Sequence, residues 1–326
     1  MAPRILVFGT GSVGSVYTYL LSQVVPASNI TAICRSNYED AAKHGFTIHS
    51  TIWGNDLNVK PTIAKTVDDA VALADGELFD YVIVCTKAIP TQPSTAELIR
   101  PAVSANTAIV LIHNGVGVEE PYANMFPDNP LVSAVVYSPA TQVRPAVVEH
   151  KEIELMHLGT YPANDAPAQA KDAAKAFADL LTAAGATAKL HDDVQAERWT
   201  KLLVNASWNP ICALTRSRDQ QLMSSDPEAL DFVRDVMREI ASVAEAYGYG
   251  DRVNEERIEF QIGRASVRKA PGVQPSMLAD ALAGKNLEVD AIVGNVVKLA
   301  KQKGVAVPML RTVYHLARGL DGSFSR

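Results

Sequence analysis

A lysine and two asparagines recur at four-residue intervals in the second half of the chain. Lys201, Asn205 and Asn209 lie in the largely apolar segment 198–210, which is predicted to form a helix that Pro210 ends or kinks. At about 100° per residue, the three side chains fall within about 80° of one another on one helix face. This face is unusual for a plain surface helix, because lysine is costly to bury unless it has a role or a partner, and asparagine weakens a helix interior. A solvated polar stripe is the alternative, and this segment alone does not decide between them.

The N-terminal end of the chain carries a second chemical signal. The apolar run Arg4–Phe8 leads directly into a glycine-rich turn, and a helix is predicted from Val16 to Val24. In such a unit the first glycine permits the turn, the second lets the backbone approach a pyrophosphate, and the third allows close packing. This order favours a dinucleotide, bound at the helix N-terminus, over a purely structural turn. The turn comprises Gly9, Thr10, Gly11, Ser12, Val13 and Gly14.

The end of the second predicted strand indicates which dinucleotide is bound. The strand Ile30–Cys34 is followed by Arg35 and Ser36, and no acidic residue occurs before Glu39. Sites that prefer NAD usually carry Asp or Glu at this strand end to hold the ribose 2′-hydroxyl. A guanidinium group instead fits a 2′-phosphate and also stacks on adenine. The sequence therefore favours NADP(H), the alternative being an exposed loop arginine.

Polar residues also follow two further apolar strands. The predicted strand Tyr81–Cys85 is followed by Lys87, and the predicted strand Ala108–Ile112 by Asn114. Ligands of open α/β sheets bind at the carboxyl ends of the strands. We therefore expect Lys87 to contact cofactor phosphate or ribose, and Asn114 to reach the nicotinamide end. Asn-Gly is also a common turn sequence, so a turn without a ligand fits Asn114 equally well.

These residues need two different scaffolds. Further strands are predicted at Leu131–Tyr137 and, as an antiparallel ribbon closing the sheet, at Val147–His150 and Ile153–Leu155. Nearly everything beyond this half has a helical pattern. The predicted fold class is therefore α/β, with an N-terminal Rossmann-type parallel-sheet domain, residues 1–193, and an all-helical C-terminal domain, residues 194–326.

Two residues of the helical half are further candidates for a site. Ser276 precedes a helical run, where a serine serves as N-cap or helps a helix N-terminus bind a substrate carboxylate. Glu288 is predicted in the first turn of a helix spanning 286–303, as a partner for Lys201. The polar segment 215–226 is predicted to be a loop.

Composition limits the classes of partner. Hydrophobic residues make up 48% of the 326 residues and charged residues 20%, as in an ordinary globular protein. The net charge of −6 and the lack of a basic run argue against nucleic acid and anionic membranes. No apolar run reaches the roughly 18 residues of a membrane span, and no signal peptide is expected, so we predict a cytoplasmic protein. The three cysteines show no metal-binding spacing, and no metal is predicted.

Together these motifs resemble the ketopantoate reductase (2-dehydropantoate 2-reductase) family over nearly the whole chain. The order of the motifs after the glycine-rich turn makes a coincidental match improbable. The matching strings are Gly9-x-Gly11-x-x-Gly14, Thr86-Lys87-Ala88, Asn114-Gly115-Val116-Gly117, Trp199-x-Lys201-Leu202-x-x-Asn205-x-x-x-Asn209-Pro210, Ser276-Met277-Leu278-x-Asp280 and Glu288.

The resemblance implies NADPH-dependent reduction of a 2-oxo acid to a 2-hydroxy acid in an interdomain cleft. Ketopantoate is the leading substrate, which would place the reaction in pantothenate biosynthesis. The resemblance implies Lys201 as proton donor, assisted by Glu288. It also implies substrate contacts from Asn114, Asn205, Asn209 and Ser276, and cofactor contacts from Lys87, Asn114 and Glu288.

One departure from the family pattern leaves the substrate open. Where family members that reduce ketopantoate usually carry an Asn-Gly pair, Asp219 lies near the expected position. A reductase of another 2-oxo acid or ketone is therefore the nearest alternative. A non-catalytic NADPH sensor is a second alternative, which intact Lys201, Asn205, Asn209 and Glu288 disfavour. The apolar C-terminal helices are compatible with a homodimer, and the protonation state of Lys201 is left undecided.

Overall fold

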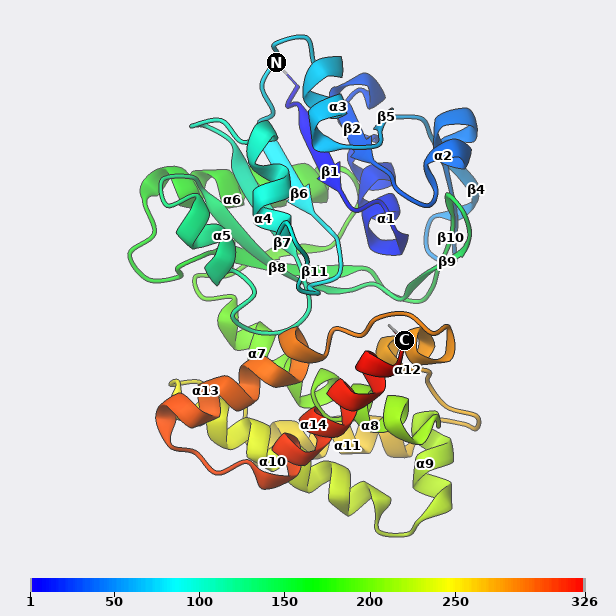
Figure 1. Cartoon of the computed structure of the whole chain (residues 1–326), viewed down its shortest axis with the longest axis vertical. Helices are drawn as coiled ribbons and strands as arrows, with labels where there is room; N and C mark the ends of the chain where they lie inside the picture. The colour runs from blue at the N-terminus through cyan, green and yellow to red at the C-terminus, as the bar shows by residue number, and fades with distance from the viewer. Residues whose placement is uncertain (1, 325–326) are drawn as a thin grey trace. The chain divides into compact units, whose positions relative to one another are not determined.

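The computed structural model describes residues 2–324, which form two compact units (Figure 1). The first unit comprises Met1–His113 and Glu119–Val194, and the second comprises Asn114–Val118 and Gln195–Arg326. The short segment Asn114–Val118 therefore belongs to the second unit, although both of its flanks belong to the first.

The first unit contains a largely parallel sheet of eight strands. Its strand order is β12-β11-β8-β7-β6-β1-β2-β5, and β8 and β11 form its antiparallel pair. The central strands are buried along their whole length, as expected of strands covered on both faces. The strands are β1 (Ile5–Phe8), β2 (Ile30–Ile33), β5 (Thr62–Ala64), β6 (Tyr81–Val84), β7 (Ala108–Ile112), β8 (Leu131–Tyr137), β11 (Leu155–Thr160) and β12 (Ala188–Leu190).

Helices cover both faces of this sheet. Ile5 and Val7 of β1 lie in one buried cluster with residues of α1 and α6, whereas Leu6 and Phe8 lie in another with residues of α3, α4 and α5. The alternation follows from the two-residue period of a strand. The helices are α1 (Ser12–Leu21), η1 (Ala27–Asn29), α2 (Tyr38–His44), α3 (Val67–Leu73), α4 (Thr95–Ile99), η2 (Arg100–Ala102), α5 (Glu120–Met125) and α6 (Ala168–Ala183).

A second sheet of four strands corrects the predicted antiparallel ribbon. It has the order β4-β3-β10-β9, with β3 (Phe46–Ser50), β4 (Gly54–Val59), β9 (Ala140–Arg144) and β10 (Val147–His150). Strand β10 pairs in parallel with β3 and antiparallel with β9, whereas Leu155 begins β11 in the large sheet. The prediction was wrong because the partner of β10 lies about a hundred residues earlier, beyond the reach of local patterning.

Every regular element in the described part of the second unit is helical, and the predicted fold class is confirmed. Its core joins apolar residues of α7, α8, α10, α13 and α14. Helix α14 packs on α8, α10, α13 and η3. The helices are α7 (Gln195–Asn205), α8 (Trp208–Thr215), α9 (Asp219–Ser225), α10 (Ala229–Ala246), α11 (Glu255–Ser266), α12 (Ser276–Leu282), the π-helical turn η3 (Asp290–Gly294), α13 (Asn295–Lys303) and α14 (Pro308–Ser323).

Three predicted boundaries in this unit are wrong. The segment 215–226 is not a loop throughout, because α9 forms within it. The helix predicted over 286–303 begins with the π-helical turn at Asp290, so Glu288 precedes the turn instead of lying in its first residues. Ser276 is the first residue of α12, and Pro275 occupies the N-cap position.

The chain has no candidate membrane helix in its described range. Among residues 2–324, no helix combines the length and the apolar character that crossing a bilayer requires.

Candidate active site

The segment that carries the lysine and the asparagines forms two helices. Helix α7 ends at Asn205 and α8 begins at Trp208. The Ser207 hydroxyl donates a hydrogen bond to the carbonyl oxygen of Leu203, and so satisfies a group at the end of α7. Pro210 neither ends nor kinks the helix, because it lies in the first turn of α8, where no intrahelical N–H bond is needed. Asn209 therefore lies on a different helix from Lys201.

Lys201, Asn114 and Glu288 form a connected polar group within the second unit. The Nζ atom of Lys201 donates to Oδ1 of Asn114 at 2.9 Å, and Nδ2 of Asn114 donates to Oε2 of Glu288 at 3.4 Å. Lys201 is half-buried and Glu288 is 8% exposed. The amide thus links a cation and a carboxylate whose residues lie far apart in the sequence.

The backbone after Asn114 is fixed by several contacts. Gly115 has a φ of +96°, and a Cβ atom there would lie 2.1 Å from the carbonyl oxygen of Ala291. Only glycine fits this position. Nη1 of Arg198 donates to the Gly115 carbonyl at 3.0 Å, and Nδ2 of Asn295 donates to the Val116 carbonyl at 2.6 Å. The Asn114-Gly115 pair is thus held by tertiary contacts and does not form a simple solvent-exposed turn.

Arg198 and Asn295 were not singled out in the sequence. Arg198 is 2% exposed, and it lies three residues before Lys201 in α7. The available signal was an arginine within a largely apolar helical segment, since arginine is rarely buried without a partner. Asn295 gave no local signal, because its partner Val116 is far away in the sequence.

The surroundings of Lys201 lower the pKa of its ammonium group. Burial is the largest cause and the Arg198 guanidinium adds to it, whereas the Glu288 carboxylate acts in the opposite direction. Together they lower the pKa of Lys201 from 10.5 to about 8. Such a group is largely protonated at neutral pH and releases its proton more readily than an ordinary lysine.

The remaining predicted substrate ligands differ in their exposure to solvent. Asn205 is half-buried, Asn209 is 5% exposed, and Ser276 is exposed. No hydrogen bond among residues 2–324 occupies the side-chain amide of Asn205 or Asn209. Both amides can therefore orient a ligand.

Asp219 has partners within its own unit. Its Oδ1 accepts hydrogen bonds from the backbone N–H groups of Gln220 and Val273, both at 2.7 Å, and its Oδ2 pairs with Arg268. Asp219 is 1% exposed. Its carboxylate therefore fastens the loop that precedes α12.

The glycine-rich turn of the first unit has the geometry of a dinucleotide loop. Gly9 has a φ of +96°, and a Cβ atom there would lie 2.6 Å from the Thr86 side chain. A Cβ atom on Gly14 would lie 2.4 Å from the Gly9 carbonyl oxygen, whereas Gly11 has open space beside it. Helix α1 begins within this turn, at Ser12 directly after Gly11, and so earlier than the predicted Val16. The open side of Gly11 and the helix N-terminus fit a pyrophosphate.

The other predicted cofactor ligands follow neighbouring strands. Strands β2, β1, β6 and β7 are adjacent and parallel, so the residues that follow them share one edge of the sheet. Arg35 and Ser36 follow β2, Lys87 follows β6, and all three are exposed. The Thr10 hydroxyl, which donates to the Ile33 carbonyl at 2.8 Å, ties the turn to β2, and Val13 is half-buried in α1. Two cationic side chains on this edge fit a dinucleotide phosphate.

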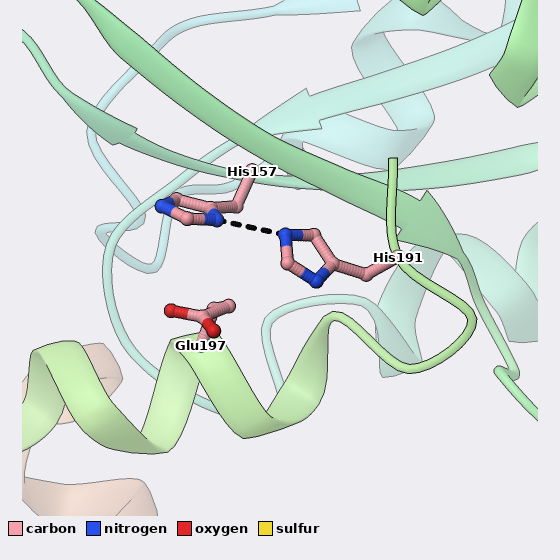
Figure 2. A group of neighbouring side chains, drawn as sticks. All are labelled: His157, His191 and Glu197. Carbon is pink, nitrogen blue, oxygen red and sulfur yellow. Dashed lines mark hydrogen bonds between the residues drawn. The ribbon is translucent and has the colours of Figure 1, made fainter. Parts of the chain in front are cut away.

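A histidine pair in the first unit was not predicted. Nδ1 of His157 on β11 and Nε2 of His191 after β12 share a hydrogen bond of 2.8 Å, drawn as the dashed line in Figure 2. Two nitrogens are fewer than the protein ligands that a zinc site takes. Glu197, also drawn there, belongs to the second unit, in which it accepts a hydrogen bond from Arg252 at 2.6 Å.

Each half of the chain matches a known sequence family. The family model described as ketopantoate reductase PanE/ApbA matches residues 5–163, and that described as ketopantoate reductase PanE/ApbA C terminal matches residues 193–321. The uncharacterized protein YDL144C of Saccharomyces cerevisiae is 30% identical to this chain, over 96% of this chain and 92% of its own length.

Solved structures give the same relationship. The 2-dehydropantoate 2-reductase from Methylococcus capsulatus has a TM-score of 0.84 at 30% identity, covering 99% of this chain and 98% of that chain. D-mandelate dehydrogenase, solved with NADH and anilino(oxo)acetate, has a TM-score of 0.82 at 21% identity over 99% of both chains, which shows a common fold. Because both family models match, and together cover most of the sequence, the chain belongs to the ketopantoate reductase family.

Proposed function

We propose that the protein reduces a 2-oxo acid to the corresponding 2-hydroxy acid with NADPH, and that 2-dehydropantoate is its leading substrate. The observation that carries this proposal is the group of Lys201, Asn114 and Glu288, with a lysine whose pKa is lowered to about 8. A lysine held in this way suits general-acid catalysis near neutral pH. The family membership and the relatives named 2-dehydropantoate 2-reductase support the choice of reaction.

The two halves of the chain have different roles in this reaction. Residues 1–193 bind the cofactor, through the glycine-rich turn with Gly11 at its open side, and through Arg35 and Lys87 on the same sheet edge. Residues 194–326 supply the substrate ligands and the proton donor. When bound there, the nicotinamide cofactor would supply the hydride, which the side chains of the protein cannot provide.

Lys201 supplies the proton that completes the reduction. Negative charge develops on the ketone oxygen as the carbonyl double bond is lost. The Lys201 ammonium stabilises this charge and transfers a proton to the oxygen, which gives the hydroxyl group of the product. Asn114 orients Nζ of Lys201, and Glu288 opposes the effect of burial on the lysine pKa.

Asn205, Asn209 and Ser276 are the proposed substrate ligands. Two neutral amides and a hydroxyl orient a carboxylate and a carbonyl without adding charge near Lys201. This assignment rests on the side chains of Asn205 and Asn209, whose amides no hydrogen bond in the described residues occupies.

NADP(H) is the proposed cofactor because Arg35 and Ser36 follow β2, where a carboxylate would favour NAD. D-mandelate dehydrogenase, which shares the fold, was solved with NADH, so the fold does not by itself select NADP(H). The choice in this chain therefore depends on the side chains after β2.

A panel of 2-oxo acids, assayed for NADPH oxidation, tests the proposal. Fast turnover of 2-dehydropantoate supports the named substrate. Fast turnover of a different 2-oxo acid, with poor turnover of 2-dehydropantoate, keeps the reaction class and replaces the substrate. Binding of NADPH with no turnover of any member would favour a non-catalytic nucleotide sensor.

A further inference from the structure

The last helix of the chain reaches the loop that carries Glu288. Asp321 of α14 is 7% exposed, and its Oδ1 accepts a hydrogen bond of 2.8 Å from the backbone N–H of Leu287. The same oxygen accepts a bond of 3.3 Å from Nδ2 of Asn286. Leu287 itself is 3% exposed and directly precedes Glu288.

Helix α14 also contacts the side chain of Asp290, on the other side of Glu288. The Tyr314 hydroxyl donates to Oδ1 of Asp290 at 2.9 Å. Nη1 of Arg318 lies 3.3 Å from Oδ2 of Asp290 and 3.3 Å from Oδ2 of Asp321. Asp290 begins the π-helical turn η3, and such turns are rare and occur frequently at functional sites. Glu288 is therefore fixed between two anchor points on one helix.

The bond to Leu287 acts on the backbone of this loop, whereas Tyr314 and Arg318 contact the side chain of Asp290. A hydrogen bond from a backbone N–H to a carboxylate is stronger than one between neutral groups. Without Asp321, the buried Leu287 N–H would lose its partner, and the loop would have to move to satisfy it. The 3.4 Å contact between Asn114 and Glu288 would change with any such movement.

We propose that Asp321 is a positioning residue for the reduction: through the Leu287 N–H it holds the Glu288 carboxylate against Asn114, and so keeps it near Lys201. This inference rests on the proposed function, because it assigns Asp321 a role through Glu288. Asp321 makes no contact with Lys201 and takes no part in proton transfer.

The readout is the pH dependence of turnover, because Lys201 must be protonated to act. The charged groups that change the pKa of Lys201 are Arg198, on its own helix, and Glu288, while Asn114 is a neutral contact. The nearby carboxylate raises the pKa of Lys201, so moving Glu288 away lowers that pKa. The alkaline limb of kcat then shifts to lower pH. A purely structural loss of stability would reduce the amount of folded enzyme without moving this limb.

The experiment measures kcat against pH for the full-length chain with saturating NADPH and the best substrate of the panel. Glu288→Gln should move the alkaline limb down by about one pH unit. Asp321→Ala should move it in the same direction by about half as much, and lower kcat about tenfold. Asp321→Asn keeps an acceptor oxygen for Leu287 and should leave the limb within about 0.2 pH units of the wild type.

Arg311→Ala is the matched control, because it removes a guanidinium group from an exposed position of the same helix and leaves the Leu287 bond and the Asp290 contacts in place. Its alkaline limb should not move. Circular dichroism and thermal melting check that each variant is folded. If Asp321→Ala does not fold, Asp321→Ser takes its place, because a serine hydroxyl is too short to reach Leu287.

The outcomes separate this inference from the proposed function. If Glu288→Gln leaves the limb in place, the role of Glu288 fails, and the inference about Asp321 fails with it. If Glu288→Gln moves the limb and Asp321→Ala does not, only the positioning role is overturned. Equal shifts in Asp321→Asn and Asp321→Ala would also overturn it, because they would show an effect of charge at a distance instead of the hydrogen bond.

Discussion

A proton donor must be charged at working pH and still release its proton readily, and Lys201 meets both conditions. We expect Lys201→Ala to lower kcat by about 10²–10⁴-fold, the usual contribution of a positioned general acid. NADPH binding, followed by the fluorescence of the reduced nicotinamide, should stay nearly unchanged, because Lys201 lies in the helical unit. Unchanged turnover in this variant would remove Lys201 from the mechanism.

The lowered pKa of Lys201 predicts a pH limit for the wild-type enzyme. Because only the ammonium form donates a proton, kcat should be constant below the pKa and fall about tenfold per pH unit above it. The limb should lie near pH 8, the pKa given to Lys201 by burial and its charged neighbours. Rates at saturating substrate across pH 6–10 measure it, and a limb near pH 10 would show that Lys201 titrates as an ordinary lysine.

Arg35 should decide the choice between the two nicotinamide dinucleotides. A charge-assisted bond to a 2′-phosphate contributes about 1.5–3 kcal/mol, so Arg35→Ala should weaken NADPH binding about 10- to 160-fold. NADH lacks this phosphate, and its Kd should change by less than about threefold. Lys171→Ala, at an exposed position on α6, is the control for a general loss of positive charge. Equal losses for both dinucleotides would contradict the role of Arg35.

Short connecting segments place the candidate residues, and the segment at Gly115 is tightly constrained. Gly115→Ala should lower the free energy of unfolding by about 2–4 kcal/mol, because an added Cβ meets the Ala291 carbonyl and φ is positive. Gly284→Ala is the matched control in the same unit. It has a φ of +62° and open space beside it, so only the backbone strain of about 1–2 kcal/mol applies. Denaturant unfolding of both variants measures the difference, and equal losses would show that the close contact is unimportant.

An element can be predicted from the sequence when the residues that determine it are close together in the chain. The unit of β1, glycine-rich turn and α1 was predictable because its cause is local: an apolar run followed by spaced glycines. The break between α7 and α8 was not, since it depends on the Ser207 hydroxyl bonding to Leu203, and serine occurs in many continuous helices. The role of Asp219 depends on Arg268 and Val273, about fifty residues away, and no local pattern shows it.

The candidate site follows the same rule. Lys201 and Asn205 were predicted from helical spacing, and both lie on α7. That spacing wrongly extended the same face to Asn209, which α8 carries. The contact between Asn114 and Glu288 joins residues 174 positions apart and required the tertiary structure. The resemblance to a family supplied their grouping, whereas spacing alone could not.

The chain crosses between its two units more than once, and this affects how the second unit folds. Val116 is 5% exposed and belongs to the core of the helical unit, although its segment follows β7. Its carbonyl and that of Gly115 accept bonds from Asn295 and Arg198. A fragment of residues 195–326 would therefore lack part of its own core and leave the buried Arg198 without this acceptor.

We predict that this fragment unfolds at lower temperature and less cooperatively than a matched fragment that regains the missing segment. In the matched fragment, residues 113–119 are joined ahead of residue 195 through a flexible glycine-serine linker of about 15 residues. The regained Val116 and backbone acceptors should raise the free energy of unfolding by about 2–3 kcal/mol, from one buried apolar side chain and the bond to Arg198. Replacing Val116 with Asp in the joined segment should abolish the gain, because a carboxylate would then enter the helical core. If the two fragments have the same melting temperature by circular dichroism, the segment Asn114–Val118 contributes nothing to the stability of the helical unit.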